Sequence, residues 1–264
     1  IDGDGDLDVL TFSQLGSYVQ YYKNLSLENH GTCDSLDFVL RSGCWGRFSE
    51  NASTNDVALN APCPFTVPNP ELGGPPITTY LDEQTGRAKA HAGSAVTPID
   101  LDGDAVMDLL LGDISFPNIV ALSNGGTVDA SLITSTDNAF PSYNEPVNVP
   151  VFPGSFYVDV NNDGKRDLLV SPNARSLSQN YKSLWYYNNI GTDAAPVFEF
   201  QQEDLFQSRM IDLGEGAYPV PFDHNGDGLM DLIVANDGYY HPSGDYIGKL
   251  ALLENIGTST NPAF

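Results

Sequence analysis

The stretch "DVNNDGKRDLLV" (residues 159–170) joins a group of oxygen-bearing side chains to the start of an apolar run. Its defining positions are Asp159, Asn161, Asp163, Gly164 and Asp167. Oxygens at every second residue of a tight loop can converge on one centre, and Ca²⁺ takes roughly six to eight oxygen ligands. Glycine after the third ligand permits the positive φ that a sharp loop needs. An acidic surface turn is the alternative, because Asp, Asn and Gly are common in turns.

Three other segments repeat the pattern: "IDGDGDLDVL" (1–10), "DLDGDAVMDLLL" (100–111) and "DHNGDGLMDLIV" (223–234). All fit D-x-[DN]-x-[DN]-G-x-x-D followed by apolar residues, with two departures. Ala105 replaces the glycine at loop position six, and Ile1 already stands at loop position two, so the first copy lacks its leading Asp. This repetition favours calcium loops over acidic turns.

An EF-hand is the other calcium loop to consider, and loop position twelve argues against it. An EF-hand has a bidentate Glu there and continues into a helix. Here the position is Leu111, Val170 or Val234, in leucine-rich and β-branched runs typical of strands. The sequence therefore predicts calcium loops between strands.

Three complete loops and one incomplete loop predict three to four Ca²⁺ ions. The expected side-chain ligands are Asp100, Asp102, Asp104 and Asp108; Asp159, Asn161, Asp163 and Asp167; and Asp223, Asn225, Asp227 and Asp231. Position seven should offer only its backbone carbonyl, at Val106, Lys165 and Leu229, with the Lys165 ammonium in solvent. The first loop offers only Asp2, Asp4, Asp6 and Asp8 and should be the weakest site or empty.

The repeat length predicts an all-β architecture of propeller blades. The last loop Asp recurs at Asp8, Asp108, Asp167 and Asp231, with spacings of 100, 59 and 64 residues. Strand-like segments precede the three complete loops ("SAVTPI", "SFYVDV", "AYPVPF") and follow them ("DLLLGD", "DLLVSP", "DLIVAN"). "SLWYYNNIGT" and "KLALLENIGT" give a third strand, and "AAPVFEF" and "TNPAF" begin a fourth. Four strands in a repeat near 60 residues are typical of a blade.

The loops and the N-x-G-T-x-x-x-P-x-F segments resemble the FG-GAP or VCBS repeats of integrin-α-like β-propellers. That resemblance implies a Ca²⁺ loop between the first two strands of each four-stranded blade. It divides the single propeller region into blades at about 1–92, 93–150, 151–213 and 214–264. Such propellers usually have seven or eight blades, so we expect an open arc from a longer chain. "NIGTSTNPAF" is also similar to secreted multidomain surface proteins of Bacteroidota, many exported by the type IX system.

Residues 28–90 depart from the repeat and are expected to form an insertion on the first blade. This segment contains the run "VPNPELGGPP" and should form a small hairpin around "LDFVL" and "DVALN". It also contains all three cysteines, Cys33, Cys44 and Cys63. We expect one disulfide among them, with Cys44–Cys63 favoured, which fits an oxidising compartment. Three reduced, buried cysteines are the alternative.

Composition limits the partners. The net charge is −24, and 14 of the 35 acids lie in the four loops. So acidic a surface disfavours nucleic acid and anionic membranes as partners. There is no apolar run long enough to span a membrane. The calcium concentration outside cells is high enough to fill the weak sites typical of extracellular modules. We therefore expect secretion or display at the cell surface.

No catalytic constellation is recognisable. The four histidines lack helical metal-ligand spacing, and no nucleophile elbow or phosphate loop is present. We therefore expect a noncatalytic domain that binds a protein or glycan within a larger protein. A calcium-dependent polysaccharide lyase and a structural spacer are the alternatives. Candidate ligand-binding residues lie between the second and third strands of the last blade: Tyr239, Tyr240, His241 and Tyr246.

Overall fold

The computed structural model describes residues 1–264 apart from 14–15, 52, 65–92, 175–178, 180 and 242. The described chain is built from antiparallel sheets, as predicted, and these strands form no closed sheet. Contacts divide it into two compact units, residues 1–174 with 185–202 and residues 175–184 with 203–264. None of the described helices has the length and apolarity needed to cross a membrane.

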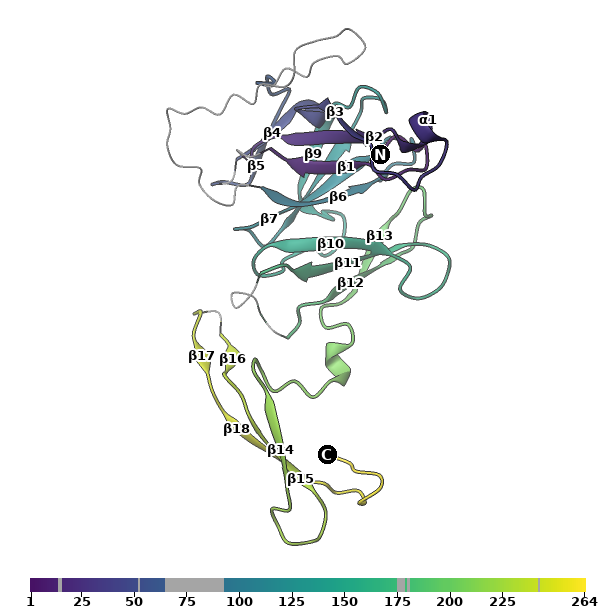
Figure 1. The fold of residues 1–264 in the computed structure, drawn as a ribbon. Coiled ribbons are helices and arrows are strands. Elements are labelled where there is room, and N and C mark those ends of the chain that lie inside the picture. Colours follow the sequence, from purple (N-terminus) through teal and green to yellow (C-terminus); the bar gives the residue numbers. More distant parts are fainter. Residues whose placement is uncertain (14–15, 52, 65–92, 175–178, 180, 242) are drawn as a thin grey trace. The chain divides into compact units, whose positions relative to one another are not determined.

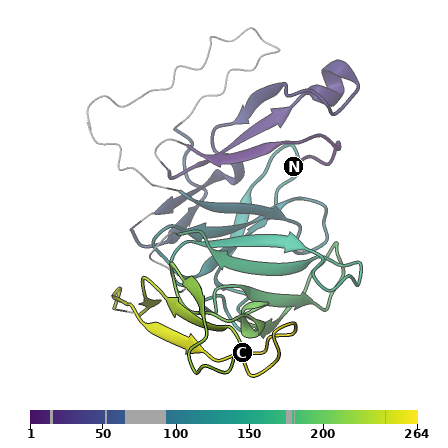
Figure 2. The ribbon, with the colours of Figure 1, turned by 60° about the horizontal axis from the view of Figure 1, so that its bottom comes forward.

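Three sheets make up most of the first unit (Figure 1). The first sheet has the strands β1 (Val9–Phe12), β2 (Val19–Asn24) and β3 (Phe38–Ser42). The second has β6 (Ser94–Ile99), β7 (Asp108–Asp113), β8 (Ile119–Asn124) and β9 (Ile133–Phe140). The third has β10 (Pro153–Val158), β11 (Asp167–Pro172), β12 (Trp185–Asn189) and β13 (Phe198–Gln202). Neighbours in sequence pair in order within each sheet, and the β6–β9 sheet lies between the other two (Figure 2).

The middle sheet is apolar on both faces because it packs on both sides. Leu110 belongs to a core cluster shared with the β10–β13 sheet. Leu109 and Leu111 belong to a second cluster, shared with β2 and with the segment around Trp45. Successive side chains of a strand point to opposite faces, so a strand buried on both faces needs an unbroken apolar run. The run "DLLL" in β7 meets that requirement.

Close approach of the second and third sheets explains the glycine after this run. A Cβ at Gly112 would lie 1.7 Å from the Pro153 carbonyl oxygen at the start of β10. Nearby, the Ser155 hydroxyl donates to the Thr97 hydroxyl at 2.8 Å, joining β10 to β6. Only glycine allows the backbones to come this close.

The predicted insertion contains one strand that belongs to the first sheet. β3 pairs with β2, with Leu40 opposite Tyr22. The predicted pairing of "LDFVL" with "DVALN" is therefore wrong. The hairpin instead joins β4 (Phe48–Asn51) to β5 (Asp56–Leu59), and the described part of this region also contains α1 (Ser26–His30) and the 3-10 turn η1 (Trp45–Arg47). The run "VPNPELGGPP" lies outside the described residues.

A disulfide joins Cys44 to Cys63 across 19 residues, while Cys33 is exposed and outside it. The favoured pairing is confirmed in this structure. Closing a loop of this length stabilises the folded state by about 3 kcal/mol in the chain-entropy account.

We expect the Cys44→Ser/Cys63→Ser double variant to lose about 3 kcal/mol of unfolding free energy, measured by urea denaturation. Cys33→Ser is the matched control and should leave the urea midpoint unchanged. Equal midpoints for the double variant and the unchanged chain would contradict a stabilising role.

The second unit contains a three-stranded sheet in the order β14 (Tyr218–Phe222), β15 (Asp231–Ala235) and β18 (Leu250–Leu253). A two-stranded hairpin of β16 (Tyr239–Tyr240) and β17 (Tyr246–Ile247) extends between β15 and β18, and η4 (Gln207–Arg209) precedes the sheet. Residues 260–264 ("TNPAF") form no strand; the Ile256 amide bonds the Ala263 carbonyl at 2.7 Å and closes a turn.

Candidate calcium loops

The four predicted loops adopt one backbone arrangement. Three of them connect paired strands: 100–108 joins β6 to β7, 159–167 joins β10 to β11, and 223–231 joins β14 to β15. The fourth, residues 1–8, precedes β1. In each loop the amide of position seven donates to the position-five carboxylate, at 3.1, 2.7, 2.9 and 2.8 Å in chain order. The same residue types at the same spacing therefore build the same turn.

Two loop positions have left-handed backbone. Position six has a positive φ in all four copies, including Ala105 at 65°, although alanine there is strained. Position four has the same conformation, at Gly3, Gly103, Asn162 and Gly226. Sequence reasoning identified only position six. The repeated Gly or Asn at position four carries the same signal, because these residues tolerate positive φ best.

The last Asp of each loop is buried and fixes the loop to the sheet. Asp167 is fully buried, and its two oxygens accept the amides of Val160 at 3.0 Å and Asn189 at 2.8 Å. Asp108 makes the corresponding bonds with Leu101 and Asn124. Both bonds recur at Asp231, and Asp8 accepts the Asn24 amide and the Ile1 amino group. Position nine is therefore a structural anchor in addition to a predicted ligand.

A buried asparagine at the end of the third strand completes each anchor, and sequence reasoning missed its role. We call this residue the hub asparagine: Asn24, Asn124, Asn189 and Asn255. In the third loop the Asn189 side chain donates to the Arg166 and Thr192 carbonyls and accepts the amides of Gly191 and Val197. The N-x-G-T pattern contained the signal, since a side chain with two donors and an acceptor oxygen can connect loop, strand and turn.

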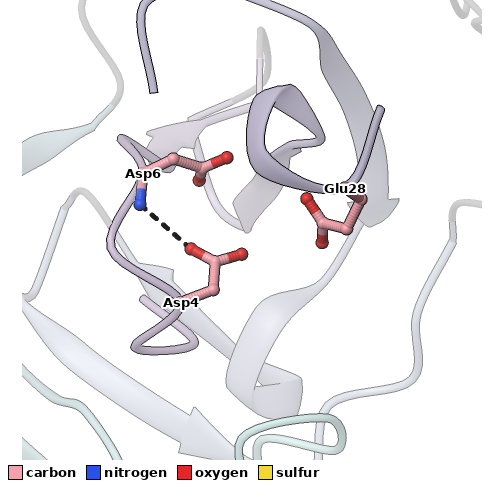
Figure 3. Close-up of side chains that lie close together, drawn as sticks. All are labelled: Asp4, Asp6 and Glu28. Carbon is pink, nitrogen blue, oxygen red and sulfur yellow. Dashed lines mark hydrogen bonds between the residues drawn. The ribbon is translucent and has the colours of Figure 1, made fainter. Parts of the chain in front are cut away.

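Acidic side chains converge as a cation site requires in two of the four loops, the first and the second. Ligand oxygens of Asp100, Asp102 and Asp108 lie within 4.8 Å of one another. Asp4 and Asp6 make a similar cluster with Glu28 of α1, a residue outside the sequence pattern (Figure 3). Asp6 Oδ1 is buried without a hydrogen-bond partner, whereas Asp4 Oδ2 lies 3.3 Å from Lys23 Nζ. An all-oxygen donor set with an unpartnered buried oxygen fits a hard cation.

The third and fourth loops have an amide at position three. The Asn161 amide donates to Asp163 at 3.3 Å, and the Asn225 amide donates to Asp227 at 3.0 Å. Positions three and five therefore lie side by side in both loops. Each amide leaves its oxygen as the predicted ligand atom.

Burial and hydrogen bonds act in opposite directions on two of the anchor carboxylates, Asp108 and Asp231. Burial raises the pKa of Asp108 to about 6, although the amides of Asn124 and Leu101 act in the opposite direction. For Asp231 the amide hydrogen bonds from Asn255 and His224 outweigh burial and lower the pKa. Hydrogen bonds from backbone amides therefore favour the charged form of both carboxylates.

The predicted position of the Lys165 ammonium is wrong. Lys165 Nζ donates to the Asn189 carbonyl at 2.7 Å and lies 3.6 Å from Asp163 Oδ2, so it folds back onto the loop. A buried carbonyl and an acid together attract the ammonium out of solvent. The neighbouring Arg166 side chain binds Asp193 at 2.7 Å, which lowers the Asp193 pKa to about 2.

The predicted ligand-binding aromatics lie on or beside the β16–β17 hairpin. Tyr240 pairs with Tyr246 across it, and the His241 amide donates to the Asp245 carbonyl at 3.2 Å. The Tyr239 ring has Lys249 Nζ 5.1 Å from its centroid, a cation–π contact. The hairpin therefore brings the four candidates into one local element.

Residues 159–234 match the family model of the FG-GAP-like repeat. The match begins at the first Asp of the third loop and ends in β15, just after the fourth loop. No curated protein and no solved structure matched the chain.

Proposed function

We propose that this chain is a noncatalytic, calcium-stabilised region of an open β-propeller that binds a protein or glycan at the cell surface or outside the cell. The observation that carries the proposal is the convergence of carboxylates in the second loop, whose hydrogen-bonded turn recurs in the other loops. The FG-GAP-like match over 159–234 supports the propeller. The rest of the propeller and further domains of the parent protein are its expected intramolecular partners.

In the three complete loops, Ca²⁺ would be held by positions one, three, five and nine and by the position-seven carbonyl. When bound, the ion neutralises carboxylates that otherwise repel one another. Hydrogen bonds within the chain hold the loop in place: position nine bonds the loop to the third strand, and the hub asparagine bonds that strand to the loop. A bound ion would therefore stabilise the junction between loop and sheet.

An extracellular setting is supported by two independent features. The Cys44–Cys63 disulfide is characteristic of oxidising compartments. Calcium loops on propeller modules outside cells work at the high calcium level found there. Export through the type IX system stays part of this proposal.

Isothermal titration calorimetry with CaCl₂ tests the metal site. We expect one ion for each complete loop and no comparable heat with MgCl₂, because Mg²⁺ requires near-octahedral geometry and gives up its water reluctantly. Absence of calcium binding would refute the proposal. Glycan and protein arrays then separate a binding domain from a spacer, and release of unsaturated ends from acidic polysaccharides would instead identify a lyase.

The β16–β17 hairpin is our candidate ligand-binding surface, because aromatic rings with polar neighbours suit stacking on sugars or contacts with proteins. We expect Tyr239→Ala/Tyr240→Ala to weaken binding to a ligand found on the array by about tenfold or more, measured by biolayer interferometry. Tyr218→Ala is the control, since Tyr218 is 72% exposed but lies on β14. Equal loss in both variants, or none in the first, would exclude the hairpin.

A further inference from the structure

The first loop differs from the other three in having a lysine from the third strand of its repeat that contacts three acids. Lys23 of β2 places Nζ 2.6 Å from Asp2, 3.3 Å from Asp4 and 2.5 Å from Glu28. Its side chain is only 19% exposed. One ammonium therefore bridges loop positions three and five and the additional acid from α1.

Lys23 occupies a position that can be identified in every repeat, because it directly precedes the hub asparagine. The corresponding residues are Ser123, Asn188 and Glu254. In the third repeat the Asn188 side chain accepts a hydrogen bond from Asn161, at loop position three, at 2.8 Å. Lys23 reaches the same loop position in the first repeat, at Asp2. In the first and third repeats the residue before the hub asparagine thus faces the loop, and of the four residues at this position only Lys23 is a cation.

The three contacts suit the chemistry of an ammonium, which donates to the carboxylates of Asp2, Asp4 and Glu28. Lysine supplies three donors, which match the three carboxylates. The ammonium lies beside Asp2 Oδ2 and Asp4 Oδ2, oxygens that a Ca²⁺ ion would need at about 2.3–2.6 Å, and its positive charge would repel the ion.

Lys165 in the third loop provides a contrast. Its ammonium bonds a backbone carbonyl and approaches only one acid, at 3.6 Å. It enters from loop position seven instead of from the third strand. A lysine near the loop is therefore not equivalent to a lysine before the hub asparagine.

We propose that Lys23 is a tethered cation that takes the place of Ca²⁺ in the first loop, and that the residue before the hub asparagine determines which loops bind the metal. This inference rests on the proposed calcium function. It assigns the first loop to a metal-independent class and the loops with Ser123, Asn188 and Glu254 to the calcium-binding class.

The test transfers the lysine to a complete loop. We expect Ser123→Lys to bind one Ca²⁺ ion fewer than the unchanged chain in calorimetry, and to melt higher in EDTA because its ammonium neutralises the loop acids. Ser123→Met, of similar length but uncharged, should keep the full number of ions. Full binding by Ser123→Lys, or loss in Ser123→Met as well, would overturn the inference.

A metal-free readout keeps the inference separate from the calcium function. In EDTA, Lys23→Met should melt roughly 3–8 °C below the unchanged chain, because the Asp2, Asp4 and Glu28 carboxylates lose their cation. Arg41→Met, which removes an exposed cation from β3 of the same sheet, is the control and should shift the melting temperature little. An unchanged melting temperature for Lys23→Met would overturn the tethered cation. If the unchanged chain binds no calcium, the proposed function is refuted. The melting temperature of Lys23→Met in EDTA would still test whether Lys23 stabilises the first loop.

Discussion

Removing calcium is expected to lower the melting temperature of this chain by about 10 °C. A ligand that binds only the native state stabilises it by about 2.7 kcal/mol when its concentration is a hundred times its dissociation constant. For a chain of this size each kcal/mol is worth roughly 2–4 °C. Several loops contribute, so the combined shift should exceed that of one site. Differential scanning calorimetry in EDTA and in millimolar CaCl₂ measures it.

Single loop variants divide this shift among the sites. Asp102→Ala removes a position-three ligand and should abolish only the second loop's share of the calcium-dependent shift. Asp129→Ala is the matched control, since Asp129 is an exposed acid outside the four loops. Identical melting curves with and without EDTA for the unchanged chain would show that the loops fold and persist without the metal.

Local features of the fold could be predicted because they depend on local sequence. The strands expected at 94–99, 108–113 and 167–172 coincide with β6, β7 and β11. Each apolar run starts directly after a loop or ends directly before one, which fixes its limits. The expected 155–160 strand instead ends at Val158, because loop three already begins at Asp159 and turns the chain.

Features that depend on distant pairing could not be read in the same way. β3 joins β2 instead of β5 because the first sheet has an open edge there, and no local pattern in "LDFVL" specifies that edge. The cluster of Lys23 and Glu28 with the first loop also depends on where β2 and α1 pack. The role of the hub asparagine could have been predicted from the sequence. Because β8 runs antiparallel to β7, it must end beside the loop at which β7 starts.

The anchor at loop position nine should matter for folding whether or not calcium is present. We expect Asp167→Ala to lower the unfolding free energy by about 3–5 kcal/mol, because it leaves the buried amides of Val160 and Asn189 without acceptors and removes buried volume. Urea denaturation in EDTA measures this loss without any contribution from metal.

Asp163→Ala is the matched control for this anchor. Asp163 belongs to the same loop, but its side chain is 37% exposed and it accepts loop amides instead of fixing the loop to β12. In EDTA its replacement should cost about 1 kcal/mol or less, whereas in CaCl₂ it should remove the third loop's calcium-dependent stabilisation. The two positions would then differ in EDTA, where replacing position nine lowers the unfolding free energy far more than replacing position five does. If both variants lose the same free energy in EDTA, the buried Asp167 has no separate anchoring role and the loop acids act only as metal ligands.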